Sequence, residues 1–444
     1  MLSGPERAIF DFKRVFVVLS NICNCRCIMC NNRHHSLGRS SLTFADVQRV
    51  ARFALRNGAE VLDFSGGEPF QFPHIAQLIR EFGSSDMALN IVTNGTIMTK
   101  EHLDAVADAR SLRLQVSTHG LGAVEDSIKC RSSASRQVDK TLKMLTEASV
   151  SISLATVVQK ENLHQLVDIY RHFSGLPYTH HSFVMYEPIG DTTAGYIDPA
   201  KVRIRPEQAE ELQRQMTTVI DEARADGNAI NLDGPLVEKY VERILSEWPE
   251  AEPHEANALD MPAPETAAPA EEHHAASRDF SHPGLLCTIP RRNLFIDHNG
   301  DVMPCFHFDW KALNSNCNIA GTAVEDLVFS PEYLDMILTA IGPGGCPGCD
   351  AACYIWDPDF RRRATQPNKD DQVVALLARR PHAVYAVGAT ATPDPEMQSA
   401  LTRANARASY LDQALRTVEQ GSSWRLTAPL RRLRRALRRP EHEV

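Results

Sequence analysis

The stretch Val17-Val-Leu-Ser-Asn-Ile-Cys-Asn-Cys-Arg-Cys-Ile-Met-Cys30 decides how this chain can fold. It begins with apolar, β-branched residues that are typical of a buried strand and continues into a loop with four cysteines. Three of them, Cys23, Cys27 and Cys30, have C-x3-C-x2-C spacing. Thiolates are soft ligands that suit iron–sulfur clusters, and three on one loop can hold three irons of a cubane and leave the fourth open. The stretch therefore predicts a cluster at the end of a strand, with zinc bound by these thiols and His34 or His35 as the alternative.

Composition narrows the class of protein. The chain has 444 residues, of which 43% are hydrophobic and 23% charged, and it contains no apolar run long enough to span a membrane. Its net charge of −9 argues against a protein that coats nucleic acid. Met1–Arg14 lacks the apolar core of a secretion signal, so we expect a cytoplasmic protein. In a reducing compartment its eleven cysteines, most of them clustered, indicate metal binding rather than disulfides.

Apolar runs alternate with amphipathic stretches from Arg14 to about Asn228. The predicted strands are Val15–Leu19, Val61–Phe64, Leu89–Val92, Leu112–Ser117, Ser151–Val158 and His181–Met185. The predicted helices are Thr43–Arg56, Ile75–Phe82, Lys100–Ala107, Arg136–Ala148, Leu163–Phe173 and Glu207–Ala225. Six strands alternating with helices predict a parallel sheet with right-handed crossovers, here a partial (β/α)6 barrel of the TIM type, whose chemistry lies at the carboxyl ends of the strands.

A short polar or glycine-rich motif follows each later strand. These motifs are Ser65-Gly-Gly-Glu-Pro69, Thr93-Asn-Gly95, Val116-Ser-Thr-His-Gly120, Val157-Val-Gln-Lys-Glu-Asn162 and Tyr186-Glu-Pro-Ile-Gly190. One Gly-Gly turn after a strand is usually only a turn. The cysteine triad and five motifs in this order, however, resemble the radical S-adenosylmethionine (SAM) superfamily over roughly residues 14–230.

The resemblance implies cofactors and residue roles. A 4Fe–4S cluster would bind Cys23, Cys27 and Cys30, and SAM would bind its open iron. The residues implied in SAM binding are Met29, Gly66, Gly67, Glu68, Pro69, Asn94, Ser117 and Asn162. A flavodoxin- or ferredoxin-type donor would supply an electron, and SAM would be cleaved to a 5′-deoxyadenosyl radical that abstracts hydrogen from a substrate.

Three side chains are candidate catalytic residues because they lie near strand ends: His119, Tyr186 and Glu187. His119 either faces the substrate or is a structural histidine with satisfied hydrogen bonds. Cys25, the extra cysteine of the loop, is interpreted as a small buried hydrophobic residue rather than a ligand.

A second group of cysteines begins at Cys287. Leu294–Ile296 and Asp301–Met303 predict a hairpin that turns at Asn299-Gly300. Cys305 follows this hairpin, and Cys346, Cys349 and Cys353 come later in the chain. The layout resembles the twitch domain, a shortened SPASM domain that carries one auxiliary 4Fe–4S cluster. This resemblance implies that the cluster ligands are Cys287, Cys305, Cys346 and Cys349. Cys353 is either a spare cysteine or the ligand in place of Cys349. A zinc knuckle is the alternative. Cys130 and Cys317 are ordinary thiols or, alternatively, one of them donates a hydrogen atom to a substrate radical.

We expect four regions. The barrel would span residues 1–230, a helix with an Ala/Pro/Glu-rich linker 231–282, the auxiliary-cluster α+β domain 283–360, and a helical, basic extension 361–444. In that extension Leu430, Leu433 and Leu437 share a helical face with arginines around it. This pattern suits peripheral contact with the inner membrane face or an acidic partner, and a solvated tail is the alternative. The tail also resembles those of polysaccharide-assembly proteins.

Three functions compete. The first function is dehydrogenation of a sugar, cyclitol or glycan, because an auxiliary cluster that accepts an electron favours net oxidation. The twitch cysteines also resemble those of 2-deoxy-scyllo-inosamine dehydrogenase. The second is maturation of a ribosomal peptide by cross-linking or epimerisation. The third is a non-enzymatic, metal-bearing binding module, against which the ordered cofactor motifs argue.

Overall fold

The computed structural model describes residues 2, 4–30, 40–186, 199–247, 289–303 and 317–341. They all belong to the first of two compact units, residues 1–383 and 384–444. The predicted helical tail therefore lies outside the described residues. No helix of the described part is long and apolar enough to cross a membrane.

One eight-stranded sheet organises this unit, in the order β6-β5-β4-β3-β2-β1-β7-β8. The strands are β1 Arg14–Val18, β2 Val61–Ser65, β3 Ala88–Thr93, β4 Leu112–Ser117, β5 Ile152–Val158, β6 Tyr178–Met185, β7 Asn293–Ile296 and β8 Val302–Met303. Neighbouring strands from β1 to β6 pair in parallel and follow one another along the chain. This is the winding of a TIM-type barrel, so the predicted partial (β/α)6 fold is confirmed.

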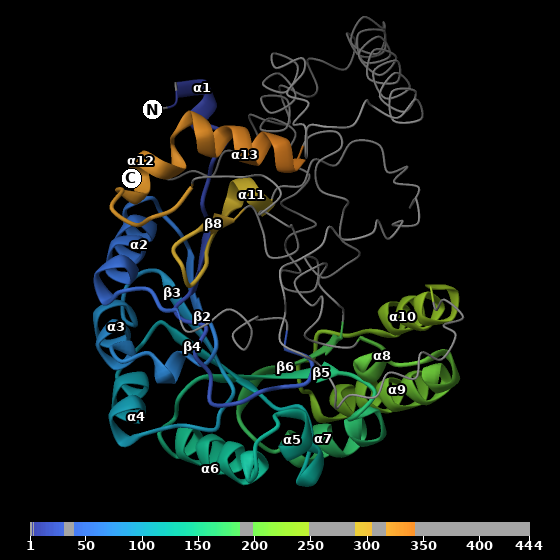
Figure 1. Cartoon of the computed structure of the whole chain (residues 1–444). Helices are drawn as coiled ribbons and strands as arrows, with labels where there is room; N and C mark the ends of the chain where they lie inside the picture. The colour runs from blue at the N-terminus through green and yellow to red at the C-terminus, as the bar shows by residue number, and fades with distance from the viewer. Residues whose placement is uncertain are drawn as a thin grey trace, which may run out of the picture. The chain divides into compact units, whose positions relative to one another are not determined.

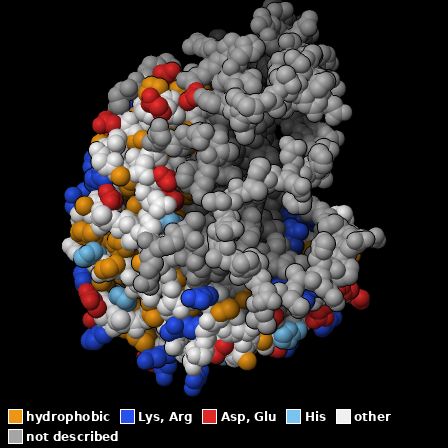
Figure 2. All heavy atoms as spheres, viewed as in Figure 1, with side chains coloured by type: hydrophobic (Ala, Val, Ile, Leu, Met, Phe, Trp, Pro, Cys, Tyr) orange, Lys and Arg blue, Asp and Glu red, His pale blue; other side chains and the backbone are white. Residues whose placement is uncertain are grey.

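Helices cover one face of the sheet (Figure 1). The longer helices are α2 Phe44–Arg56, α3 Ile75–Phe82, α4 Lys100–Ala107, α6 Ala134–Glu147, α7 Leu166–Phe173, α9 Ala209–Asp226, α10 Gly234–Glu247 and α13 Pro331–Ile341. The shorter ones are α1 Gly4–Arg7, α5 Ala123–Ile128, α8 Pro199–Val202, α11 Ile289–Arg292 and α12 Val324–Val328. At the predicted start of α2, Thr43 Oγ1 accepts from Asp46 N at 3.1 Å and Asp46 accepts from Thr43 N, a capping box. Side chains of both charges are mixed over the outer surface (Figure 2).

The strands alternate between two environments. In β4, Leu112, Leu114 and Val116 are buried in the core shared with the helices. Arg113 and Ser117 therefore lie on the opposite face, because successive side chains of a strand point to opposite sides. We call this opposite face the inner face. Polar side chains on the inner face are not covered by these helices, so a ligand can reach them more readily than side chains on the helix-covered face.

The predicted second hairpin joins the same sheet. β7 and β8 pair antiparallel, and Gly300 has a φ of +87° in the turn between them, as glycine allows. The hairpin prediction is confirmed. β7 also pairs in parallel with β1, with Arg14 opposite Asn293 and Phe16 opposite Phe295. The sheet thus continues from the barrel strands into the segment that carries the second cysteine group.

Candidate active site

The cysteine loop follows β1 at the carboxyl edge of the sheet. Cys23, Cys27 and Cys30 are partly exposed, whereas Cys25 is buried with 1% of its surface exposed. Cys25 Sγ lies 3.8 Å from Thr96 Oγ1, and hydrogen bonds with Cys23 and Cys27 lower the pKa of the Cys25 thiol. The three thiols predicted to hold a cluster are thus the accessible ones.

Two glycines after β2 let this loop lie against the neighbouring strand end. Gly67 N donates to Ser20 O at 2.7 Å, and Glu68 N donates to Ile22 O at 2.9 Å. A Cβ on Gly66 would lie 2.4 Å from Ser20 O, and one on Gly67 would lie 2.1 Å from Ile22 O. No side chain fits there, so the Gly-Gly pair is required for the contact between the two loops.

Glu68 fastens the next strand end to the same place. Its side chain is buried and accepts from Asn94 N at 2.7 Å, Thr93 Oγ1 at 2.7 Å and Phe70 N at 3.1 Å. Burial raises the pKa of this carboxyl group to about 7. The predicted cofactor residue therefore acts within the protein by holding the turn after β3.

Asn94 connects that turn to the cysteine loop. Its Nδ2 donates to Asn24 Oδ1 at 2.9 Å and approaches Cys23 Sγ at 3.7 Å, while its Oδ1 accepts from Thr96 N at 2.8 Å. Asn94 thus supplies an N–H group beside the first of the three predicted thiolate ligands. Such a donor stabilises the charged form of a thiolate.

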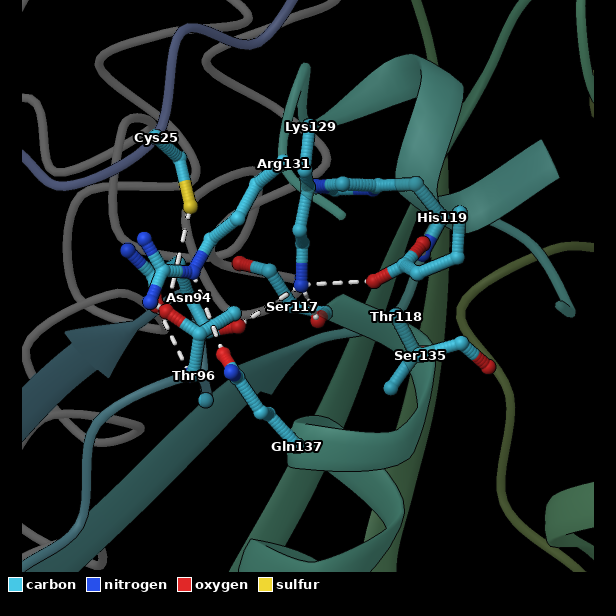
Figure 3. Close-up of polar contacts among 12 residues, drawn as sticks. Cys25, Asn94, Thr96, Ser117, Thr118, His119, Lys129, Arg131, Ser135 and Gln137 are labelled. Atoms are coloured by element: carbon cyan, nitrogen blue, oxygen red, sulfur yellow. Dashed lines mark hydrogen bonds and ion pairs between the residues drawn. The ribbon is translucent and has the colours of Figure 1, made fainter. Parts of the chain in front are cut away.

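A buried lysine joins the loop to two strand ends (Figure 3). Lys129 follows α5, is fully buried, and forms an ion pair with Glu125 at 2.6 Å. Its Nζ also donates to Asn94 O at 2.6 Å and to Ser117 O at 2.9 Å, so three acceptors take its three hydrogens.

The backbone around Lys129 holds the cysteine loop as well. Arg26 N donates to Lys129 O at 3.1 Å, and Ile28 N donates to Ile128 O at 2.9 Å. Sequence reasoning did not single out Glu125 or Lys129. A Glu–Lys pair four residues apart is ordinarily a surface pair, and only the tertiary structure shows that this one is buried.

His119 and Asn162 close the ends of β4 and β5. His119 Nδ1 accepts from Val157 N at 3.1 Å, which leaves the ring proton on Nε2. Burial and the charge of Lys129 hold the pKa of His119 well below its usual value. Asn162 donates to His119 O at 2.6 Å and Val157 O at 2.8 Å and accepts from Gln159 N at 2.9 Å. Both side chains thus organise the backbone, and contact of either with substrate or cofactor remains a prediction.

Two polar side chains at the same edge have no such internal use. The Ser117 hydroxyl makes no hydrogen bond to any described residue. Gln159 is completely buried, and within the described part of the chain neither atom of its carboxamide has a hydrogen-bond partner. An unpaired buried amide costs roughly 1–3 kcal/mol, so Gln159 is a group that a polar ligand would satisfy. Sequence reasoning missed it because an amide in a loop gives no sign of burial.

An apolar cluster lies beside these groups. Met29 of the cysteine loop packs with Ile128, Tyr186 and Val202, and Cys27 and Val157 pack against the cluster. Met29 and Tyr186, predicted in cofactor binding and catalysis, are thus brought together next to Cys27.

The remaining predicted site residues are not described. Glu187 and the auxiliary cysteines Cys287, Cys305, Cys346, Cys349 and Cys353 lie outside the described residues. Within the described ranges, no three His, Cys, Asp or Glu side chains are placed to hold a single metal ion.

The described residues fit the predicted cofactors. Three accessible thiols occur on one loop, and Asn94 Nδ2 faces Cys23. Ser117 and Gln159 offer polar groups that no described residue satisfies, and an apolar cluster packs against Cys27. Thiolates suit iron–sulfur clusters, and polar groups together with apolar side chains suit an adenosine-containing ligand.

Known families match two segments of the chain. The model of the Radical SAM superfamily matches residues 17–173, and the model of the SPASM iron-sulfur cluster-binding domain matches residues 287–353. The first match contains the cysteine loop and the motifs after the first five strands. The second begins at Cys287 and ends at Cys353.

Curated relatives share the first segment. PqqA peptide cyclase of Bradyrhizobium diazoefficiens is 27% identical over 158 residues, which are 35% of this chain and 41% of that protein. The subtilosin biosynthesis protein AlbA of Bacillus subtilis is 23% identical over 153 residues, 34% of each chain. These alignments span less than half of the relatives' own length.

A solved structure shares the fold. Streptococcus suis SuiB bound to its precursor peptide SuiA superposes with a TM-score of 0.53 and 18% identity, covering 77% of this chain and 73% of that one. SuiB bound to S-adenosylmethionine gives the same TM-score.

We expect Gly67→Ala to displace the cysteine loop, because the added Cβ would overlap Ile22 O. The free energy of unfolding should fall by about 1–3 kcal/mol, and the iron bound after anaerobic reconstitution should fall with it. Gly175→Ala is the control, since a Cβ there meets nothing within 4 Å. Full iron binding by Gly67→Ala would contradict the proposed role of this contact.

Lys129→Met should lower the free energy of unfolding by ~3–5 kcal/mol, because it leaves the Glu125 carboxylate buried without its counter-charge. Adding Glu125→Gln should restore part of the loss, because the amide oxygen still accepts from His119 N while the buried charge is gone. Urea unfolding of the three proteins measures this. A Lys129→Met variant as stable as the wild type would show that the ion pair contributes nothing.

Proposed function

Because this chain belongs to the radical SAM superfamily and carries a C-terminal SPASM-like iron–sulfur domain, we propose that it is a radical SAM enzyme that matures a precursor peptide. Its cofactors are a 4Fe–4S cluster with SAM and auxiliary iron–sulfur chemistry in the SPASM-like segment. The observation that carries the proposal is the cysteine loop, whose three accessible thiols lie at the carboxyl edge of the sheet.

We assign the cofactor contacts to the residues of this edge. Cys23, Cys27 and Cys30 hold the cluster, and Ser117 and Gln159 bind polar groups of SAM. When bound, these cofactors supply a carbon-centred radical that abstracts hydrogen from a substrate. The loops around them exclude water, because Met29 and Tyr186 pack together next to Cys27.

Relatives support a peptide substrate over a sugar or cyclitol. Proteins similar to this chain include PqqA peptide cyclase, AlbA and the sporulation killing factor maturation protein SkfB of Bacillus subtilis. The fold is shared with SuiB, which was solved with a precursor peptide. Peptide maturation, the alternative to dehydrogenation of a glycan, is therefore the better supported reading.

The second cysteine group completes the proposal. Cys287, Cys305 and Cys346, with Cys349 or Cys353, would hold an auxiliary cluster in the proposed domain 283–360. A flavodoxin- or ferredoxin-type protein would deliver the electron. The basic tail in 361–444 would contact a membrane surface or an acidic partner.

The function is tested on the full chain, reconstituted anaerobically and supplied with dithionite and SAM. Peptides encoded beside its gene should lose two hydrogens by cross-linking, or take up deuterium from D2O by epimerisation, as mass spectrometry would detect. The Cys23, Cys27, Cys30→Ala variant should bind about four irons instead of about eight and leave the peptides unchanged. If the peptides stay unchanged and the enzyme instead oxidises members of a panel of sugars and cyclitols, the substrate is a sugar or cyclitol and not a peptide.

Gln159→Met should change stability and SAM affinity in opposite directions. Without cofactor, it removes an unsatisfied buried amide, so the free energy of unfolding should rise by roughly 1–3 kcal/mol. With cofactor, it removes a hydrogen-bonding partner, so the dissociation constant of SAM should rise about tenfold. Calorimetric titration and urea unfolding measure the two effects. Unchanged SAM affinity would place the amide outside the cofactor site.

A further inference from the structure

One arginine on the inner face of the sheet has no acidic partner among the described residues. Arg113 lies between Leu112 and Leu114, whose side chains are buried in the helix-covered core, so its own side chain points to the inner face. It is exposed, and among the described residues no carboxylate or other acceptor binds its guanidinium. Within the described part of the chain its guanidinium therefore keeps its five N–H donors for a ligand.

Its neighbours on the adjacent strands do not neutralise it. Asp63 of β2 is almost completely buried and accepts from Arg14 Nε at 2.5 Å, Arg14 Nη2 at 2.6 Å and Asn90 Nδ2 at 3.0 Å. Asn90 is the register partner of both Asp63 and Arg113. The one acidic group in this row is therefore already engaged by another arginine, and no described carboxylate compensates the charge of Arg113.

We propose that Arg113 binds a carboxylate of the substrate, so that the peptide this enzyme modifies carries an Asp or Glu side chain inside the barrel. The inference rests on the proposed function, because it concerns the substrate of that same site. Guanidinium groups match carboxylates with two parallel hydrogen bonds, and such charge-assisted pairs are the stronger class.

A second group in the row favours a peptide over an inorganic anion. Asn90 Oδ1 is buried and has no hydrogen-bond donor among the described residues. This oxygen accepts an N–H group, which a peptide provides, whereas it repels the oxygens of a phosphate. Arg113 thus presents two donors to the acidic side chain, and the unsatisfied Asn90 Oδ1 on the neighbouring strand favours a ligand that also carries N–H groups.

The position of Arg113 sets the spacing in the substrate. Arg113 and Ser117 are four residues apart in β4, and Ser117 lies at the edge with the cofactor residues. Four residues of strand span about 13 Å, so the acidic residue lies roughly two to four extended residues from the carbon that loses hydrogen.

The experiment compares two pools of fluorescein-labelled heptapeptides, X3-Glu-X3 and X3-Gln-X3, where X is any uncharged residue. Binding to the reconstituted full chain is followed by fluorescence anisotropy at fixed salt. The wild type should bind the Glu pool about tenfold more tightly. Arg113→Met should bind both pools alike, and Arg113→Lys should keep part of the preference, because it keeps the charge but loses the planar fork.

Arg110→Met is the matched control, since it removes one positive charge from an exposed position just before β4. It should keep the wild-type preference. Arg113→Glu should reverse the preference toward an X3-Lys-X3 pool, which a merely damaged protein would not do. A preference for Glu that survives in Arg113→Met overturns the inference, and so does equal binding of the first two pools by the wild type. In both cases a modified peptide in the mass assay would leave the proposed function standing.

Discussion

The candidate site depends on a single buried ammonium group. Lys129 pairs with Glu125 and donates to the carbonyl groups at the ends of β3 and β4, while its own carbonyl group accepts from the cysteine loop. Three segments that are distant in sequence, the cysteine loop, the turn after β3 and residues 117–129, therefore meet at this one residue. A buried ion pair tolerates little displacement, because losing one partner leaves the other desolvated and unpaired. The position of α5 (Ala123–Ile128), which carries Glu125, thus fixes where the thiols lie.

Several residues that the sequence predicts to bind the cofactor also hold the backbone of the site. Glu68 holds the turn after β3, Asn162 closes the turn after β5, and Gly67 lets two loops touch. Such contacts preorganise a site, because they give loops on a rigid sheet defined positions. Ser117 and Gln159, whose side chains make no hydrogen bond within the described part of the chain, are the groups that we propose to contact SAM.

The sequence predicted the strands and helices of the barrel to within about three residues, because burial on one side of each strand leaves a period that is visible locally. It also predicted the turn at Asn299-Gly300, since that dipeptide favours the left-handed turn. It did not predict α5 or the burial of Lys129, because a Glu–Lys pair has the same sequence pattern on a surface and in a core. Nor could it show that β7 pairs with β1, since residues 14 and 293 share no local pattern. Long-range register and the satisfaction of polar groups are properties of the folded chain.

The pairing of β7 with β1 gives the inner face two different ends. In one row of register partners, Phe295 of β7 and Phe16 of β1 have ring centroids 6.1 Å apart, and the row continues through Asp63 and Asn90 to Arg113. The row is apolar at the first end and positively charged at the other. From β1 to β4 there are three strand spacings, or about 14 Å. With its carboxylate at Arg113, the proposed peptide would run along β4 toward Ser117, and the phenylalanines would lie about that distance to its side. The pairing of β7 with β1 thus gives the proposed substrate surface a direction, and such a surface would let a rigid barrel select one carbon among the many C–H bonds of a flexible peptide.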